Sequence, residues 1–315
     1  MKLRARMLER IRSFFASRGV LEVETPALSR AATTDPHLAS LATRYRGPGA
    51  AEGATLHLHT SPEFPMKRLL AAGSGAIYQV CRVYRDGEAG HLHNPEFTMI
   101  EWYRPGVDHH GLMAEVAELI AAALAPERAL EATERLTYQE AFERYVGCNP
   151  HRVSGRELKG KAKALDIAAP ESLAEQDLDG WRDLLLTQAI EPQLGCGRLS
   201  FLYDYPASQA AGARVRPGDP PLVSRFEAYL DGIELANGFH ELTDAAEQRR
   251  RFASDLARRR AVGLPEVPMD ERLLAALENG LPECSGVALG FDRLVMCACG
   301  ARDIREVLAF PLDRA

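Results

Sequence analysis

The sequence predicts an α+β fold in which a mainly antiparallel sheet is flanked by helices. Short alternating strands are joined by hairpin signals such as Asp231-Gly232, a favoured two-residue turn. Amphipathic stretches of helical period lie between these strands, and that arrangement is typical of α+β proteins. The glycine signatures of Rossmann and P-loop sites do not occur, so neither kind of nucleotide site is expected.

The N-terminal part predicts helices and strands in alternation. Apolar residues recur at helical spacing from Leu3 to Phe15, and Gly19 suits the end of that helix. Ser61-Pro62-Glu63 is a helix-start signal, with proline at the first position. The expected elements are helices over 2–18 and 111–124, a helix starting at Ser61, and strands over 20–26, 56–60, 77–85 and 96–103.

The C-terminal part continues this alternation. Residues 150–195 are rich in Ala, Glu and Leu and predict two or three helices as an insertion. Asp244, followed three residues later by Glu247, is a helix-capping pattern. The other expected elements are strands over 198–206, 224–230, 233–239 and 286–290 and helices over 245–262, 269–280 and 291–300.

Composition limits the classes of function. The chain has 315 residues and a net charge of −6, whereas proteins that coat nucleic acid usually carry a basic excess. The sequence contains no run of 18 apolar residues, so no membrane span is predicted. The N-terminal segment is charged throughout and lacks the apolar core of a signal peptide. We therefore expect a cytoplasmic protein.

Residues 85–103, RDGEAGHLHNPEFTMIEWY, combine a charged loop with a strand that carries rings and acids. Phe97 and Glu101 share one strand face and lie roughly 13 Å apart, at about 3.3 Å per residue. That distance suits adenine stacked on Phe97 and an amino group paired with Glu101. Arg85 and His93 are placed to reach phosphate oxygens, and arginine binds phosphate bidentately. An exposed hairpin with scattered charge explains the same pattern.

The segment GIELANGFHEL (232–242) carries two acids, Glu234 and Glu241, which a regular strand would place on opposite faces. A turn or bulge at Asn237-Gly238 would let both carboxylates converge. Mg²⁺ takes a few protein oxygens together with phosphate oxygens, so this pair predicts a magnesium site. Solvated acids on a surface hairpin are the alternative.

The segment SGVALGFDRL (285–294) places a charge in an apolar helix. Gly286 and Gly290 let a backbone approach a ligand closely. Arg293 requires a partner, and a phosphate or an adenine face would supply one. A salt bridge to an acid near Asp292 or to Glu306 is the alternative.

These segments, in this order, resemble the signature motifs of class II aminoacyl-tRNA synthetases, most closely the lysyl enzyme. The predicted first helix, strand and Pro26 look like motif 1, which implies a homodimer interface. YRDGEAGHLHNPEF resembles motif 2 and ALGFDRL resembles motif 3. The resemblance covers nearly the whole chain and implies one class II synthetase-like catalytic domain over 1–315. The N-terminal anticodon-binding OB domain of the lysyl enzyme is expected to be absent.

The resemblance also implies roles for individual residues. Arg85 and Arg293 would be catalytic, with Arg85 on the α-phosphate, His93 toward the γ-phosphate, and Phe97 and Arg293 enclosing adenine. The residues assigned to ATP are Arg85, Asp86, Gly87, His93, Asn94, Phe97, Glu234, Leu235, Gly290 and Arg293. Those assigned to the amino acid are Ser61, Pro62, Glu63, Glu101, Tyr103, Glu241 and Ala288, and those assigned to Mg²⁺ are Glu234 and Glu241.

The whole pattern resembles the elongation factor P–(R)-β-lysine ligase family, which are truncated paralogues of lysyl-tRNA synthetase. This resemblance implies ATP and Mg²⁺ as cofactors, (R)-β-lysine or lysine as substrate and elongation factor P as protein partner, without stable tRNA or membrane binding. Ala288 replaces a glycine of the lysyl enzyme. Gly87 replaces a motif 2 glutamate, for which Glu88 is a candidate substitute.

Two other classes of function remain open. The first is a lysine-activating paralogue that charges tRNA or a free amine. The second is a non-catalytic paralogue that binds an amino acid and acts as a regulator. Arg85, Glu234, Glu241 and Arg293 favour an enzyme, since a protein that only binds has no need of the full ATP set.

Overall fold

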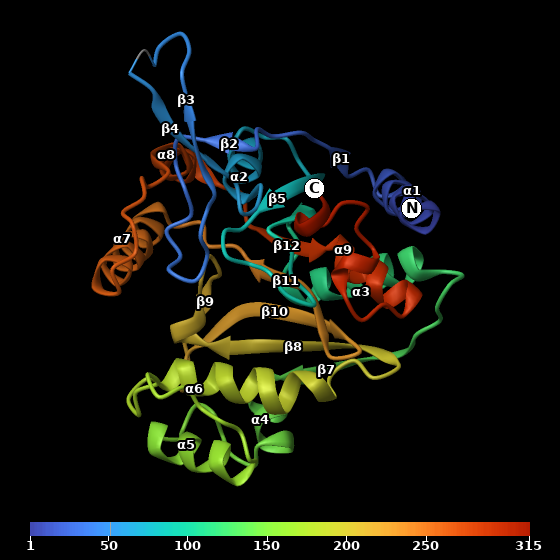
Figure 1. The fold of residues 1–315 in the computed structure, drawn as a ribbon, viewed down its shortest axis with the longest axis vertical. Helices are drawn as coiled ribbons and strands as arrows, with labels where there is room; N and C mark the ends of the chain where they lie inside the picture. Colours follow the sequence, from blue (N-terminus) through green and yellow to red (C-terminus); the bar gives the residue numbers. More distant parts are fainter. Residues whose placement is uncertain (51) are drawn as a thin grey trace. The chain divides into compact units, whose positions relative to one another are not determined.

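The computed structural model describes residues 1–50 and 52–315 and divides into two compact units (Figure 1). The first unit combines Met1–Asp108 with Glu241–Ala315, and the second is His109–His240. The second unit is therefore inserted into the sequence of the first. The single catalytic domain expected from the sequence stays a prediction.

The first unit contains a four-strand path in the order β1-β5-β6-β12. Its strands are β1 (Leu21–Glu22), β5 (Ile77–Tyr84), β6 (Glu96–Pro105) and β12 (Cys284–Gly290). β1 pairs with β5 in parallel, whereas the β5–β6 and β6–β12 pairs are antiparallel. The strand expected over 20–26 is thus much shorter than predicted, because only Leu21 and Glu22 join the ladder.

The same unit holds a smaller sheet and five longer helices. The small sheet, in the order β2-β4-β3, consists of β2 (Leu28–Ser29), β4 (Ala54–Leu58) and β3 (Ala42–Tyr45), and its β3–β4 hairpin projects from the unit (Figure 1). The helices are α1 (Lys2–Ser17), α2 (Glu63–Ala71), α7 (Ala245–Ala261), α8 (Glu271–Gly280) and α9 (Phe291–Cys299). Each matches a predicted helix to within a few residues.

Helices cover both faces of this sheet. Phe15 of α1 stacks on Tyr78 at 4.2 Å and meets Trp102 edge-on at 5.4 Å between ring centroids. Tyr103 points to the opposite face, where it joins an apolar cluster contributed by α2, α7 and α8. Because side chains alternate along β6, Glu101 shares the face of Tyr103, whereas Trp102 lies on the face that α1 covers.

The buried carboxylate of Asp292 links distant segments of the first unit. Asp292, at the start of α9, accepts a 2.6 Å hydrogen bond from the backbone N–H of Thr98 and pairs with Arg4 of α1. Arg4 also donates to Thr98 Oγ1 at 2.6 Å. Asp292 therefore connects the first helix, the central strand and the last helix.

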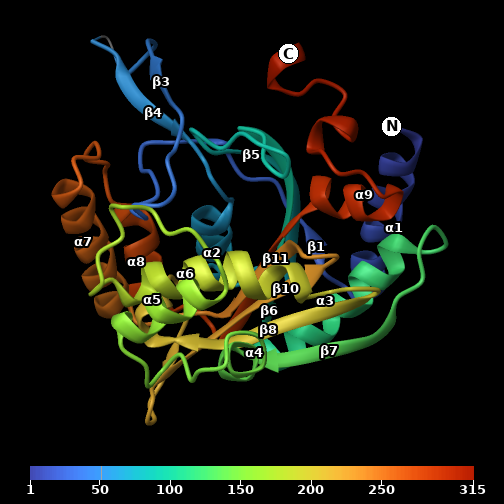
Figure 2. The same cartoon turned by 60° about the horizontal axis from the view of Figure 1, so that its bottom comes forward.

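The second unit combines a sheet with helices that pack against it. Its strands follow the order β11-β10-β8-β7, with β7 parallel to β8 and the other pairs antiparallel, and β9 pairs with β10. The strands are β7 (Glu131–Thr137), β8 (Arg198–Pro206), β9 (Val215–Arg216), β10 (Leu222–Leu230) and β11 (Ile233–His240). The helices are α3 (His109–Leu124), α4 (Tyr138–Tyr145), α5 (Gly155–Ala164) and α6 (Leu178–Leu185), which a π turn (Leu186–Ile190) continues. Figure 2 shows α5 and α6 side by side.

The hairpin of β10 and β11 corrects one expectation. Asp231 and Gly232 both have positive φ, as the predicted tight turn requires. However, Asn237 and Gly238 do not interrupt the ladder, since they pair with Glu227 and Phe226. The register instead shifts between Ala228 and Tyr229, opposite Ala236 and Glu234, so Leu235 is the extra residue. The predicted break at Asn237-Gly238 was wrong.

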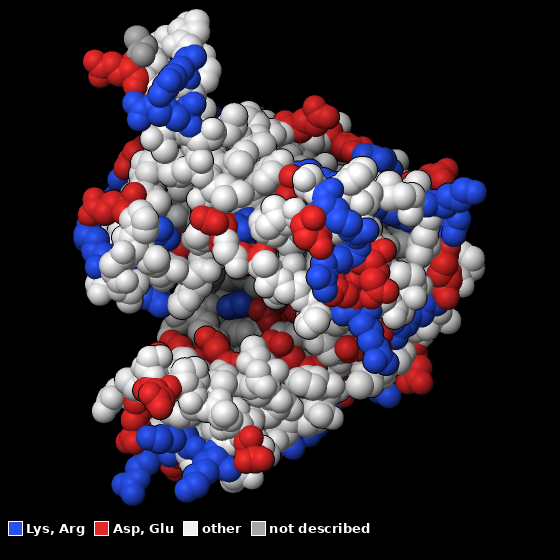
Figure 3. Space-filling view, in the orientation of Figure 1, with Lys and Arg blue, Asp and Glu red and all other residues white. Residues whose placement is uncertain are grey.

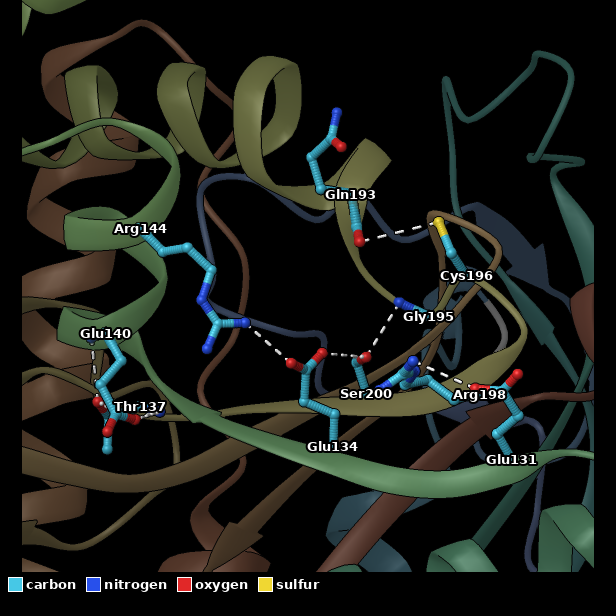
Figure 4. A network of polar contacts seen from close by, with 10 residues as sticks. All are labelled: Glu131, Glu134, Thr137, Glu140, Arg144, Gln193, Gly195, Cys196, Arg198 and Ser200. Atoms are coloured by element: carbon cyan, nitrogen blue, oxygen red, sulfur yellow. Dashed lines mark hydrogen bonds and ion pairs between the residues drawn. The ribbon is translucent and has the colours of Figure 1, made fainter.

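A chain of polar contacts holds the parallel pair of the second unit (Figure 4). Arg144 of α4 donates to Glu134 at 2.9 Å, and Ser200 Oγ donates to the same carboxylate at 3.1 Å. Ser200 in turn accepts from the N–H of Gly195 at 3.0 Å. A Cβ at Gly195 would lie 2.6 Å from backbone atoms of Tyr229 and Leu230, so this loop requires glycine. The contacts thus join α4, β7 and β8.

Charged side chains of both signs are interspersed on the face shown in Figure 3. The basic residues of α7 follow this pattern, because Arg249 pairs with Glu271 and Arg250 with Glu247. Within residues 1–50 and 52–315, no helix is long and apolar enough to cross a membrane.

Replacing Asp292 with alanine should destabilise the first unit. The change leaves the Thr98 N–H and the Arg4 guanidinium without their buried carboxylate, which costs about 3 kcal/mol of unfolding free energy. Urea unfolding measures the loss. Arg12→Ala, which removes an exposed pair with Glu22, is the control and should change stability little. Equal losses in the two variants would contradict this role of Asp292.

Candidate active site

A buried ammonium stands between two carboxylates in the first unit. The Nζ of Lys67 lies 2.6 Å from Oε1 of Glu63 and 2.6 Å from Oε2 of Glu241. The Lys67 side chain is 1% exposed and that of Glu241 is 2% exposed. Glu63 and Lys67 share one face of α2 at i,i+4 spacing, and Glu241 is fixed by its own N–H, which donates to the carbonyl of Cys284.

A third carboxylate, Glu101, lies in the same cluster. Its oxygens accept from Ser61 Oγ at 2.6 Å and from the Tyr103 hydroxyl at 2.7 Å. Ser61 Oγ also accepts from the N–H of Glu63 at 3.0 Å, beside Pro62 at the start of α2. The structure thus brings together six of the seven residues predicted to bind the amino acid. These are Ser61, Pro62, Glu63, Glu101, Tyr103 and Glu241.

The electrostatics follow from three neighbouring acids, two of which contact one base. Burial and the charge of Glu63 raise the pKa of Glu101 to about 8. Burial raises the pKa of Glu241 to about 7, although Lys67 acts in the opposite direction. Burial alone would lower the pKa of Lys67, but Glu241 and Glu63 outweigh it and raise that pKa above its ordinary value. The cluster therefore holds more acid than it can neutralise and suits an additional ammonium.

The neighbouring strand β12 completes this face. Gly286 pairs with Tyr103 and Ala288 pairs with Glu101, so the methyl group of Ala288 shares the face of the carboxylate cluster. A Cβ on Gly286 would lie 2.3 Å from the Tyr103 ring and 2.5 Å from Oε1 of Glu241. Glycine at this position therefore allows the strand to approach the cluster.

The motif 2-like segment places Arg85 over a ring. The guanidinium carbon lies 5.0 Å from the Phe97 ring centroid, and one nitrogen lies 3.4 Å from Glu88. Gly87 has φ +78°, a conformation that a glutamate there would adopt only with strain. Glu88, the candidate substitute for a glutamate at position 87, thus provides a carboxylate next to Arg85.

His93 and Arg293 lie in contact. One Arg293 nitrogen lies 2.7 Å from Nε2 of His93, and Arg293 also donates to the carbonyl of Leu92 at 3.2 Å. Burial and the positive charge of Arg293 lower the pKa of His93, so its ring is neutral at pH 7 and accepts this bond. A neutral His93 can bind phosphate through a hydrogen bond, while the positive charge comes from the arginines.

The remaining predicted ATP residues of the first unit have local structural contacts. Asn94 donates to the carbonyl of Glu96 at 2.7 Å and accepts from the N–H of Leu312 at 3.1 Å. Asp86 donates its N–H to the carbonyl of Ala39 at 2.8 Å. Gly290 pairs with Met99 and directly precedes α9.

Glu234 and Leu235 lie in the second unit, on β11. That unit contains a buried acid that the sequence reasoning missed, Glu227. It accepts from Tyr205, Arg225 and Asn237, at 2.5, 2.5 and 3.2 Å. Sequence reasoning could have singled out Arg225, Glu227 and Asn237. Arg225 and Glu227 are two charges in an otherwise apolar strand, and such charges require a buried partner.

Lys67 is the other site residue that the sequence reasoning missed. The spacing Glu63-x-x-x-Lys67 is a sequence signal for an ion pair on a helix, but it does not reveal the second carboxylate. No group of three or more His, Cys, Asp or Glu residues that could hold a metal is present in the described part of the chain. One oxygen of Glu241, a predicted Mg²⁺ ligand, already faces the Lys67 ammonium.

A cavity of about 510 Å³ within the first unit opens beside the cluster. Ser61, Glu63 and Arg85 line it, together with apolar side chains that include Leu38, Leu58 and Phe64. This volume and mixed lining are typical of small-molecule sites. The first unit thus combines a cavity, an acidic cluster and a nearby arginine.

The fold and this site define a class of protein. Residues 1–314 match the family model of class II tRNA synthetases (D, K and N), and the chain belongs to that family. The class II synthetase-like fold predicted from the sequence is therefore confirmed.

Individual relatives of this chain have a more specific name than the family model. Proteins named elongation factor P--(R)-beta-lysine ligase are similar to it over nearly their full length. The Vibrio cholerae protein is 54% identical over 100% of this chain and 96% of its own length. Those of Edwardsiella ictaluri and Proteus mirabilis are each 52% identical over 99% of this chain and 94% of their own lengths. The predicted resemblance to this ligase family is confirmed.

The raised pKa of Glu101 predicts a pH dependence of stability. A carboxyl whose pKa rises from 4.5 to about 8 on folding keeps its proton while the unfolded chain loses it. The native state should therefore lose stability as the pH rises from 4.5 toward 8. Glu101→Gln removes this titration. The melting temperature of the variant, relative to that of the wild type, should therefore increase as the pH rises over this range. A constant difference between pH 5 and pH 8 would contradict the raised pKa.

Gly286→Ala should distort the cluster. The new methyl would overlap the Tyr103 ring and the Glu241 carboxylate, at a cost of about 1–3 kcal/mol in unfolding free energy. Gly160→Ala is the matched control, because its Cβ meets nothing within 4 Å and lies in helix α5. Thermal or urea unfolding compares the two. A Gly286→Ala protein as stable as the control would contradict the close approach of β12.

Proposed function

We propose that this chain uses ATP to activate (R)-β-lysine or lysine and transfers the product to a lysine ε-amine of elongation factor P. The observation that carries the proposal is the cluster of the carboxylates of Glu63, Glu101 and Glu241, in which the ammonium of Lys67 pairs with Glu63 and Glu241. Its excess of carboxylates suits a substrate that brings a further ammonium. The names of the relatives support the same acceptor and amino acid.

The first chemical step joins the amino acid to AMP. An oxygen of the amino-acid carboxylate attacks the α-phosphorus of ATP, the bond to the β-phosphate breaks, and pyrophosphate leaves. Such chemistry depends on positioning and charge stabilisation rather than on a protein nucleophile. We assign Arg85 to the α-phosphate, Arg293 and Phe97 to adenine, and His93 to the outer phosphates. Asp86, Gly87, Asn94 and Gly290 are proposed to shape the same nucleotide site.

The second step forms an amide. The ε-amine nitrogen of elongation factor P attacks the activated carbonyl carbon, its bond to the phosphate oxygen breaks, and AMP leaves while the amine loses one proton. The acidic cluster is proposed to hold the substrate ammonium, and Ala288 is proposed to shape the space beside it. A methyl group there would favour a β-amino acid over its α-isomer.

Mg²⁺ is proposed to accompany ATP, as is usual in this family. It would offset phosphate charge when bound. Glu234, next to Leu235, and Glu241 stay the proposed protein ligands, and Mg²⁺ in nucleotide sites often takes only one or two carboxylates besides phosphate oxygens.

We also propose a cytoplasmic homodimer that pairs through α1, β1 and Pro26, which sedimentation of the purified protein would test.

A transfer assay tests the proposed function. The protein is incubated with ATP, labelled (R)-β-lysine and, side by side, elongation factor P and tRNA. Label should appear on elongation factor P and should disappear when its acceptor lysine is replaced by arginine. Label on tRNA would support the tRNA-charging alternative. Absence of pyrophosphate exchange with every lysine isomer would support a protein that only binds.

Arg85→Ala and Arg293→Ala should each slow adenylate formation by about 10²-fold, the effect of losing one preorganised donor to developing charge. ATP–pyrophosphate exchange measures this. Arg82→Ala is the matched control, because Arg82 is half exposed and pairs with Glu96 on the same hairpin. Exchange rates in either variant close to that of the control would remove the arginine concerned from the nucleotide site.

Ala288→Gly should shift the enzyme toward α-lysine, because it removes the methyl group that shares a sheet face with Glu101. The ratio of kcat/KM for the two isomers is the measurement. A preference that stays unchanged would mean that the isomers are distinguished elsewhere.

A further inference from the structure

We propose that the cavity of the first unit carries the docking surface for the protein acceptor, and that three exposed arginines there bind an acidic face of that partner. This surface, called the acceptor surface below, consists of Arg30, Arg68 and Arg272 together with Leu28 and Tyr45, all of which line the cavity. The inference rests on the proposed function, because it concerns the second substrate of the same reaction.

The three arginines of the acceptor surface have no counter-ion. Arg30 follows β2, Arg68 lies on α2 and Arg272 lies on α8, and all three are exposed. Within residues 1–50 and 52–315, their side chains form no ion pair. By contrast, Arg249 of α7 pairs with Glu271 at 2.8 Å. Positive charge thus gathers at the cavity without being neutralised by the chain itself.

The acids that line the same cavity are already engaged elsewhere. Glu63 pairs with Lys67 at 2.6 Å. Asp270 accepts two backbone N–H groups at the start of α8, at 3.0 and 2.9 Å. The field of the three arginines therefore extends into solvent, where it attracts a negatively charged partner.

Apolar side chains lie among these charges. Leu28 and Tyr45 are 45% and 42% exposed, so the acceptor surface offers apolar area as well as charge. Arginine and tyrosine are enriched in protein interfaces. The cavity is also lined by Leu38, Leu58 and Phe64. Because the methylene stem of a lysine packs on apolar surface while its amine stays polar, this lining suits an acceptor lysine that enters the cavity.

The cavity joins the acceptor surface to the proposed active site. Its lining includes Ser61 and Glu63 of the acidic cluster and Arg85, which is assigned to the α-phosphate. A protein seated on the acceptor surface therefore has to extend only one side chain into the cavity to approach the activated carbonyl.

A protein acceptor fits this surface better than a second copy of the chain or a nucleic acid. A two-fold self-interface centred here would place the patch against itself, and the like charges of its arginines would oppose that contact. Proteins that bind nucleic acid usually carry a basic excess, whereas this chain has a net charge of −6.

The experiment measures activation and transfer separately. ATP–pyrophosphate exchange reports activation, and label transfer at varied concentrations of elongation factor P reports docking. A triple variant with Arg30→Ala, Arg68→Ala and Arg272→Ala should keep the wild-type exchange rate. Its KM for elongation factor P should rise about tenfold or more, because electrostatic attraction of the partner is lost. Arg156→Ala, which changes an exposed arginine of α5, is the control and should match the wild type.

Salt provides a second readout. Added salt should raise the KM of the wild type for elongation factor P toward that of the triple variant, because it screens exposed charges. The KM of the triple variant should depend less on salt. If the triple variant does not fold, the three single variants answer the same question, since exposed substitutions of this kind cost little stability. Each should show part of the rise in KM.

Four results would overturn the inference. The first is an unchanged KM for elongation factor P in the variants, and the second is an equal loss of exchange and transfer, which would place the arginines in activation. The third is a change in sedimentation of the triple variant, which would assign the surface to self-association. The fourth is competition by tRNA that disappears in the triple variant, which would assign the surface to nucleic acid.

The two proposals can fail separately. If the wild type catalyses no exchange with any lysine isomer, the proposed function fails. If the wild type modifies elongation factor P and the triple variant does so with the same KM, only the acceptor surface fails.

Discussion

The contact of the Lys67 ammonium with Glu63 and Glu241 is the constraint around which the site is arranged. Three neighbouring carboxylates repel one another, and burial adds to the cost of charge on Glu101 and Glu241. The Lys67 ammonium offsets the charge of the two carboxylates that it contacts. The cation comes from α2, one of its partners follows β11 in the chain, and the strands β6 and β12 provide the surface beneath. The helix and the sheet are thus held together by charge as well as by apolar packing.

The sheet of the first unit separates two tasks between its faces. One face carries Tyr78 and Trp102 against Phe15 of α1 and contributes stability. The other carries Glu101 and Tyr103, with Gly286 and Ala288 opposite them, and contributes chemistry. Because side chains alternate along a strand, neighbouring residues serve different purposes.

Much of the fold followed from local sequence signals. Alternation and capping residues predicted most of the helices and strands, although β2, β3, β7, β9 and α4 were missed. The Asp231-Gly232 turn has the positive φ values expected of it. The prediction misplaced the bulge because Asn and Gly at 237 and 238 are turn-forming residues. The position of the observed bulge is set instead by the packing of buried side chains. Leu235 and Ala236 are adjacent and both buried, which a regular strand with one solvated face does not permit.

The site was predicted in part for a similar reason. The acids stood out because charge is unusual within apolar strands, and six of the seven amino-acid residues lie together. Lys67 was missed because its spacing to Glu63 also fits an ordinary surface pair, and its burial depends on Glu241, which is remote in sequence. Long-range pairs of this kind are set by tertiary packing, which periodicity does not report.

The discontinuity of the first unit has a consequence for biosynthesis. Strand β6 receives its second neighbour, β12, only from residues 284–290, and Arg4 finds Asp292 later still. Residues 109–240, by contrast, are contiguous and contain the whole of their own β7–β11 ladder. Since domains generally fold as units while the chain emerges, the inserted unit can reach its native state on the ribosome first, while the N-terminal segment waits for the last quarter of the chain.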